Sequence, residues 1–318
     1  MGFLQSHTIN GITYVGGFGD WVNLGGGATA PVIDTAYYIY LCDLMSQMAS
    51  AINKPDYASF YTFLKNQCLE SFKTNFLLPN GQIKESSQTA YALAFTMHLL
   101  PQDMLQKSSD QFLESVKKYD WHLATGFIGT PRLLPGLHEA GLNDVAYKLL
   151  LQDSYPSWLY QVKLGATTMW ERWDGWTKEK GFQTIGMNSF NHYAFGSVGE
   201  FMYRYVAGID TVGEGFKTIS IAPYPGPGLT SARATYQAVT GVISTDWLLS
   251  QNTFSLEVKV PPNTIAHVRI PTSNIEAVLE SGKSVEKASC VKVLSHESKA
   301  LTLEVQSGTY RFTAPYAF

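Results

Sequence analysis

The sequence predicts a multidomain α+β protein in which a helical α/α toroid is followed by an antiparallel β-sandwich. With 318 residues the chain is long for one domain, so two domains are the better expectation. Apolar residues recur at helical spacing from about residue 33 to residue 207, whereas short alternating segments begin at about residue 213. We therefore expect a helical domain over residues 1–212 and a β-sandwich over residues 213–318.

The helical pattern begins in Ile33–Ile52, where apolar residues recur at steps of three and four and predict an amphipathic helix. Ser86–Leu100 is apolar nearly all round, with Ser86 or Ser87 as its N-cap, so this helix should be buried on most sides. One-sided helices mixed with a buried one indicate an inner and an outer layer. The remaining predicted helices are Tyr57–Phe72, Met104–Lys117, Leu133–Ala140, Asn143–Leu150, Ser157–Lys163 and Ser189–Val206.

The C-terminal third consists of short alternating or β-branched segments such as TISIAP, TFSLEVKVP and ALTLEV. The turn-forming stretches PYPGPG, SQN and PPN separate them. Strands at such even spacing are typical of an antiparallel sandwich.

The composition excludes several classes of ligand, and its aromatic residues fit either a core or a carbohydrate site. Aromatic residues make up 13% of the chain, and flat rings beside polar groups suit the C–H faces of sugars. The net charge is −3 without a basic cluster, which argues against a nucleic-acid partner. Three cysteines without a CxxC pair predict neither a disulfide framework nor a zinc site. The seven histidines are dispersed and HExxH and GxSxG are absent, so we expect no metal and no cofactor.

The chain carries no recognisable targeting segment. Its first residues, MGFLQSHTINGITYV, lack both a charged n-region and an apolar h-region, so no signal peptide is expected. The longest mostly apolar run, Ala90–Pro101, is too short to span a bilayer. We expect no membrane association, and a cytoplasmic, reducing compartment by default.

The stretch GATTMWERWDG, residues 165–175, contains the strongest candidate for chemistry. Glu171 lies between Trp170, Arg172 and Trp173. One interpretation is a carboxylate that Arg172 or nearby donors hold and that acts on a water, while the tryptophans shape a sugar pocket. The alternative is a structural Glu171–Arg172 pair under an aromatic lid.

Two further segments supply candidate binding residues. In GGFGDWVNLGGG the glycines permit close approach of the backbone, with Trp21 as a platform and Asp20 bonding to hydroxyls; the alternative is a turn in which Asp20 caps a local N–H. His192 starts the last predicted helix and could contact a substrate, or it could be a structural histidine. Four other charged residues are interpreted as structural: Arg132, Glu139, Asp174 and Glu200.

Four stretches in order carry a resemblance to a known family: GDW at 19–21, ATGFIGT at 124–130, YPSWLYQVKLGATTMWERWDGW at 155–176 and NSFNHYAFGSVGEFMYRYVAGI at 188–209. The chain resembles the α-L-rhamnosidases of bacteria and fungi. This resemblance implies an (α/α)6 barrel followed by a β-sandwich, and hydrolysis of terminal α-L-rhamnose with inversion. It also implies that Glu171 is the general base, that Trp21 is an aromatic wall of the sugar pocket, and that His192 contacts the sugar.

The chain departs from that family in one respect. The family's general acid is a glutamate in an acidic, Arg-containing motif upstream of GDW, and no stretch here matches it. We therefore expect a partial (α/α)6 toroid, the C-terminal portion of a rhamnosidase that is inactive or impaired alone. Its expected partners are a rhamnose-containing glycoside and either a separately encoded N-terminal half or a second copy, since an open arc of helices exposes apolar faces. Turnover by the chain alone would require an internal acid such as Asp20 or Glu85.

Two alternatives from other classes stay open. A non-catalytic rhamnoside-binding protein would keep Trp21, Glu171 and His192 as a lectin-like site. A polysaccharide lyase would use a Tyr or His base and an Arg to neutralise a uronate; Tyr193 and Arg172 are available, although no basic subsite accompanies them.

Overall fold

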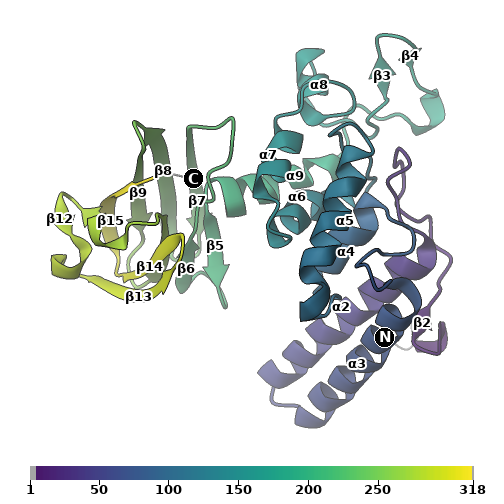
Figure 1. Cartoon of the computed structure of the whole chain (residues 1–318), viewed down its shortest axis with the longest axis horizontal. Helices are drawn as coiled ribbons and strands as arrows, with labels where there is room; N and C mark the ends of the chain where they lie inside the picture. Colours follow the sequence, from purple (N-terminus) through teal and green to yellow (C-terminus); the bar gives the residue numbers. More distant parts are fainter. Residues whose placement is uncertain (1–4, 317–318) are drawn as a thin grey trace. The chain divides into compact units, whose positions relative to one another are not determined.

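The computed structural model describes residues 5–316 and divides into two compact units, Met1–Val198 and Gly199–Phe318 (Figure 1). The first four residues of the segment in which no signal peptide is expected lie outside the described residues. The first strand of the second unit, β5 (Ile209–Val212), precedes residue 213, and the domain boundary at residues 212 and 213 stays a prediction.

The first unit is built from helical hairpins in two layers. Helix α3 packs on α2, α5 on α4, and α7 on α6, while α4 also contacts α2 and α6. Helices α2, α4 and α6 therefore follow one another in one layer. Each of them packs against one helix of the second layer, which is α3, α5 or α7. The bounds are α2 (Ala30–Ala51), α3 (Pro55–Phe76), α4 (Gln88–Thr96), α5 (Leu105–Lys117), α6 (Thr130–Glu139) and α7 (Asn143–Leu150). The predicted partial α/α toroid is confirmed.

Helix α4 follows the sequence pattern closely. The hydroxyl of Ser87 accepts a hydrogen bond from the N–H of Ala90 at 3.1 Å and so caps the helix. Residues 88–95 are all buried, because neighbouring helices cover every side of a segment that is apolar nearly all round. By contrast, α5 buries one face only, through residues such as Phe112 and Val116.

After α7 the first unit continues with short elements: α8 (Trp158–Lys163), the hairpin of β3 (Trp176–Thr177) and β4 (Gly181–Phe182), and the 3-10 turn η2 (Ile185–Met187). Near the N-terminus, β1 (Thr8–Ile9) pairs with β2 (Ile12–Thr13). The 3-10 turn η1 (Gln102–Met104) leads into α5.

The prediction of one helix over Ser189–Val206 is wrong. Residues 188–193 are irregular, and they are followed by a 3-10 turn η3 (Ala194–Ser197), a single α-turn α9 (Val198–Phe201) and a π-turn η4 (Met202–Val206). The N–H of His192 donates to the carbonyl of Met169 at 2.8 Å, so this segment bonds to a distant stretch of backbone instead of to itself. His192 therefore precedes the first turn.

The second unit contains two sheets. Their strand orders are β13-β14-β10-β6-β5 and β12-β11-β15-β9-β8-β7, and all pairs are antiparallel except β10 with β6. Alternate residues of β9 are buried, as expected for a sheet with one covered face. The antiparallel-rich sandwich is confirmed, with one parallel pair that the sequence did not reveal. The further strands are β6 (Thr218–Ile221), β7 (Ser231–Ala238), β8 (Gly241–Ser250), β9 (Thr253–Val260), β10 (Ile265–Pro271), β11 (Leu279–Glu280), β12 (Lys283–Ser284), β13 (Val291–Glu297), β14 (Ala300–Val305) and β15 (Gly308–Pro315), with the 3-10 turns η5 (Ile275–Ala277) and η6 (Val285–Lys287).

Within residues 5–316 no helix combines the length and the apolar character that crossing a bilayer requires. The same residues contain no group of three or more His, Cys, Asp and Glu side chains placed to hold a metal ion.

Candidate functional site

The backbone around Glu171 pairs with the backbone around His192. The N–H of Glu171 donates to the carbonyl of Ser189 at 2.9 Å, and the N–H of His192 donates to the carbonyl of Met169 at 2.8 Å. The hydroxyl of Thr168 also donates to the carbonyl of Phe190. Segments 168–171 and 189–192 therefore lie side by side, which brings Glu171 and His192 to one part of the unit.

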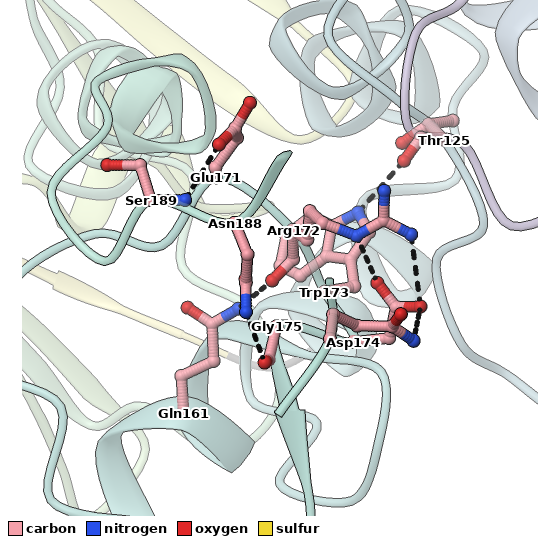
Figure 2. Close-up of polar contacts among 10 residues, drawn as sticks. Thr125, Gln161, Glu171, Arg172, Trp173, Asp174, Gly175, Asn188 and Ser189 are labelled. Atoms are coloured by element: carbon pink, nitrogen blue, oxygen red, sulfur yellow. Dashed lines mark hydrogen bonds and ion pairs between the residues drawn. The ribbon is translucent and has the colours of Figure 1, made fainter. Parts of the chain in front are cut away.

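The carboxylate of Glu171 is held at one oxygen. Its Oε2 accepts a hydrogen bond from the N–H of Ser189 at 2.8 Å, as Figure 2 shows. Its Oε1 accepts no hydrogen bond from residues 5–316, and the side chain is half-buried. A carboxylate fixed through one oxygen and open at the other can take a proton from a water, as a general base must.

Arg172 does not pair with Glu171, so the alternative of a structural Glu171–Arg172 pair is wrong, and a nearby donor, the N–H of Ser189, holds the carboxylate instead. The Nε and Nη2 of Arg172 donate to the two carboxylate oxygens of Asp174 at 2.8 and 3.2 Å (Figure 2). Gln183 also donates to Asp174, at 2.8 Å. A bidentate pair fixes the orientation of the planar guanidinium, so Arg172 is engaged within the protein. Burial raises the pKa of the nearby Tyr155 to about 12, and the charge of Asp174 acts in the same direction.

Trp173 is part of the core. Its side chain is 1% exposed, its ring stacks on Phe195 with centroids 4.0 Å apart, and its indole N–H donates to the carbonyl of Thr125 at 2.9 Å. Trp173 thus ties segment 124–130 to the Glu171 segment and presents no face to solvent. Trp170 is also buried, and it meets Phe190 edge to face with centroids 4.9 Å apart.

Asp20 is buried, and its carboxylate binds segment 124–130. The N–H groups of Gly126, Ile128 and Gly129 donate to it at 2.8, 2.7 and 3.0 Å, and the hydroxyl of Thr89 adds a further bond. The acceptor capacity of both oxygens is used inside the protein. The donors lie about a hundred positions along the chain, not next to Asp20 as in the local cap that the sequence suggested.

A close backbone approach accompanies the Asp20 contacts. A Cβ at Gly126 would lie 2.0 Å from the carbonyl oxygen of Trp21, a distance that no side chain tolerates. The glycine of ATGFIGT therefore permits segment 124–130 to lie against the GDW segment.

Trp21 and His192 are connected through Phe127. The N–H of Phe127 donates to the carbonyl of Trp21 at 3.0 Å, and the ring of Phe127 stacks on the imidazole of His192 with centroids 4.9 Å apart. The side chain of Trp21 is 41% exposed and so offers an aromatic face. Nδ1 of His192 accepts from the N–H of Ala194 at 3.3 Å, which assigns the proton of a neutral imidazole to Nε2 as a donor.

Sequence reasoning missed three residues of this arrangement: Thr89, Phe127 and Ser189. Phe127 and Ser189 lie inside the stretches that carry the family resemblance, so those motifs were a usable signal. Both act partly through their backbone N–H, which every residue but proline has, and side-chain chemistry could not point to them.

Glu85, the other acid considered as an internal general acid, is also engaged. Its Oε2 accepts from the N–H of Thr29 at 2.7 Å, and its Oε1 accepts from the hydroxyl of the same residue.

Arg132, interpreted from the sequence as structural, lies over the ring of Tyr40, 5.4 Å from its centroid. Burial raises the pKa of Tyr37, and Arg132 opposes that increase.

The chain thus combines helical hairpins in two layers with a following β-sandwich, and its helical unit holds a half-buried glutamate whose segment pairs with that of His192. The model of the bacterial α-L-rhamnosidase six-hairpin glycosidase domain matches residues 6–206, and that of the bacterial α-L-rhamnosidase C-terminal domain matches residues 208–284. The chain therefore belongs to the bacterial α-L-rhamnosidase family, as its motifs predicted.

Curated relatives and solved structures agree. An α-L-rhamnosidase of Streptomyces avermitilis is 41% identical over 311 residues, which cover 98% of this chain and 29% of the relative. One of Formosa agariphila is 37% identical over 96% of this chain and 34% of its own length. The structure of the Streptomyces avermitilis α-L-rhamnosidase complexed with L-rhamnose superposes with a TM-score of 0.92 at 40% identity, over 98% of this chain and 29% of that one. The chain thus spans about a third of the length of these relatives.

Proposed function

We propose that this chain is the C-terminal portion of an α-L-rhamnosidase that hydrolyses terminal α-L-rhamnose from glycosides with inversion, and that Glu171 is its general base. The observation that carries the proposal is the carboxylate of Glu171, bonded to the Ser189 N–H at 2.8 Å through one oxygen and open at the other. In an inverting reaction this oxygen would take a proton from the water that attacks the anomeric carbon.

The surrounding residues receive different roles in this proposal. Trp21 supplies an exposed ring for the sugar, and Nε2 of His192 donates a hydrogen bond to a sugar hydroxyl. Trp170 bounds the site near Glu171. Asp20 and Trp173 are positioning residues, because both are buried and bind segment 124–130 instead of facing solvent.

We propose that the general acid comes from a polypeptide segment other than this chain. Inversion needs two carboxyl groups roughly 6.5–9.5 Å apart. Asp20 and Glu85, the acids considered for this role, are both bonded within the protein. The chain covers 29% of its Streptomyces avermitilis relative, so the relative has ample sequence elsewhere for a second carboxyl group.

The alternative is a rhamnoside-binding protein without turnover. The internal hydrogen bonds of Asp20 and Glu85 favour the binding protein, because neither acid is then available as a general acid. Binding of a rhamnoside would need Trp21 and His192 but no acid. The lyase interpretation receives less support. Arg172 would have to neutralise a uronate, but its Nε and Nη2 already donate to the two carboxylate oxygens of Asp174.

The experiment is chromophore release from an aryl α-L-rhamnoside by three samples: this chain, this chain mixed with the separately expressed N-terminal remainder of the Streptomyces avermitilis relative, and that remainder alone. We expect turnover only in the mixture, with the β-anomer as the first product by NMR. Glu171→Gln should reduce this turnover about 10²–10⁴-fold, whereas the exposed control Glu179→Gln should leave it unchanged.

Each other result has a defined meaning. Turnover by this chain alone would refute an external general acid. Equal turnover with and without Glu171→Gln would refute its role as base. L-rhamnose binding by this chain without turnover in any mixture would establish the binding protein in place of the hydrolase.

A further inference from the structure

A cavity of about 380 Å³ is lined by part of the stretch that precedes Glu171, and Trp170 is the one lining residue that also has a role in the proposed reaction. We call it the hairpin pocket, since the β3–β4 hairpin forms one of its sides. Four aromatic residues line it, Trp170, Trp176, Phe182 and Phe190, together with the loop that follows α8, which contributes Thr167 and Thr168. Figure 1 shows α8, β3 and β4 at the same end of the first unit.

The lining of the hairpin pocket is uncharged and includes four aromatic rings. No Asp, Glu, Lys, Arg or His is among its lining residues. Phe190 meets Trp170 at 79° and Phe182 at 89°, with centroids 4.9 and 5.7 Å apart. Rings set at right angles let a flat aromatic ligand stack on one ring and contact another edge to face, which are the two favoured aromatic geometries.

Phe182 is the most exposed of these rings. Its side chain is 74% exposed although it belongs to β4, where it is paired with Trp176 of β3. A phenyl ring held at a pocket mouth by a strand pair gains apolar contact when a ligand covers it.

Hydrogen-bonding groups distinguish an aromatic ligand from a sugar. A sugar ring carries several hydroxyls that need partners, whereas the polar side-chain groups of this lining are the hydroxyls of Thr167 and Thr168 and the indole N–H groups of Trp170 and Trp176. The hydroxyl of Thr168 already donates to the carbonyl of Phe190. A ligand with one polar group and a large apolar face fits this inventory better.

We propose that the hairpin pocket binds a neutral, planar aromatic molecule of one or two rings that carries a single hydroxyl or ether oxygen. Its volume of about 380 Å³ falls within the range of small-molecule sites, roughly 300–1,000 Å³. A free phenol and the aryl part of a glycoside share this chemistry. The site is independent of the carboxylate of Glu171, so it stands or falls apart from the proposed hydrolysis.

The test is isothermal titration calorimetry of the full chain with 2-naphthol, 2-naphthyl α-L-rhamnoside and L-rhamnose. We expect 2-naphthol to bind, and Phe182→Ala to weaken it by about 10-fold, which corresponds to about 1.4 kcal/mol. Because Phe182 is largely exposed, this variant should fold normally. Phe60→Ala, at a partly exposed phenylalanine of α3 outside the pocket, is the matched control and should bind as the parent does.

Glu171→Gln separates this proposal from the hydrolase, since it should reduce turnover in the complemented enzyme about 10²–10⁴-fold and leave 2-naphthol binding intact. If Phe182→Ala also weakens the naphthyl rhamnoside, the pocket accepts an aglycone; if it weakens 2-naphthol alone, the ligand is a free phenol, and either result supports the site. The proposal is overturned if 2-naphthol does not bind, if Phe182→Ala binds it unchanged, if Glu171→Gln loses it, or if Phe182→Ala abolishes binding of L-rhamnose instead.

Discussion

Asp20 and Glu171 carry the same functional group in very different surroundings. Asp20 is 2% exposed, and its two carboxylate oxygens accept hydrogen bonds from three backbone N–H groups and one hydroxyl. Glu171 is half-buried, and one N–H occupies one of its oxygens. A carboxylate whose acceptor sites are filled fixes the chain, whereas one with an open oxygen can exchange a proton with a ligand or water. The number of internal donors thus separates Asp20, which fixes the chain, from Glu171, which keeps one oxygen open.

The largest effect expected from this comparison is on stability. Asp20→Asn replaces an acceptor oxygen by an NH₂ group that faces backbone donors, and it removes a buried charge that three N–H groups stabilise. We expect the free energy of unfolding to fall by about 3–5 kcal/mol, measured by urea denaturation. Glu171→Gln keeps an acceptor for Ser189 and should change it by less than about 0.5 kcal/mol. Equal losses in both variants would break the distinction between the two acids.

A smaller loss is expected at the backbone contact between the GDW segment and segment 124–130. Gly126→Ala places a Cβ 2.0 Å from the carbonyl oxygen of Trp21, so one of the segments must move. Overpacking of this kind costs about 1–3 kcal/mol, and the Asp20 bond to the Gly126 N–H should weaken with it. The matched control is Gly186→Ala, where a Cβ would meet nothing within 4 Å and the glycine has no positive φ. A melting temperature equally unchanged in both variants would contradict the expected clash.

The same comparison explains what the sequence could and could not predict. Burial on all sides of α4 and alternation in β9 follow from periodicity, because residues of one face share one environment. The alternative of a Glu171–Arg172 pair and the helix at Ser189 were wrong because both segments bond to distant backbone, Glu171 to the N–H of Ser189 and the His192 N–H to the carbonyl of Met169. A local pattern does not contain such partners. The same limit hid the donors of Asp20.

The smallest effect concerns the interior of the helical unit, probed by its thiols. Cys42 and Cys68 are buried whereas Cys290 is exposed. Burial raises the pKa of the Cys42 thiol to about 12 and that of Cys68 to about 11. Because the thiolate is the nucleophile, we expect a thiol reagent at mildly alkaline pH to label one cysteine quickly in the folded chain, and all three only after unfolding. Rapid labelling of Cys42 in the folded chain would contradict a closed interior.

Labelling also extends the comparison of the two acids, since Cys42 lies in α2, which follows the GDW segment that Asp20 anchors. Asp20→Asn should speed the labelling of Cys42 through local opening, and Glu171→Gln should not.

The raised pKa of the Cys42 thiol fixes the sign of the effect of pH on stability. In the unfolded chain the Cys42 thiol ionises near pH 9.0, whereas the fold keeps it protonated to a higher pH. The contribution of this thiol to the free energy of unfolding is therefore complete below pH 9.0 and is lost as the pH rises toward about 12. Urea denaturation of the parent should therefore show a steeper decline above pH 9.0 than Cys42→Ala. Parallel declines would mean that Cys42 is not held neutral by the fold.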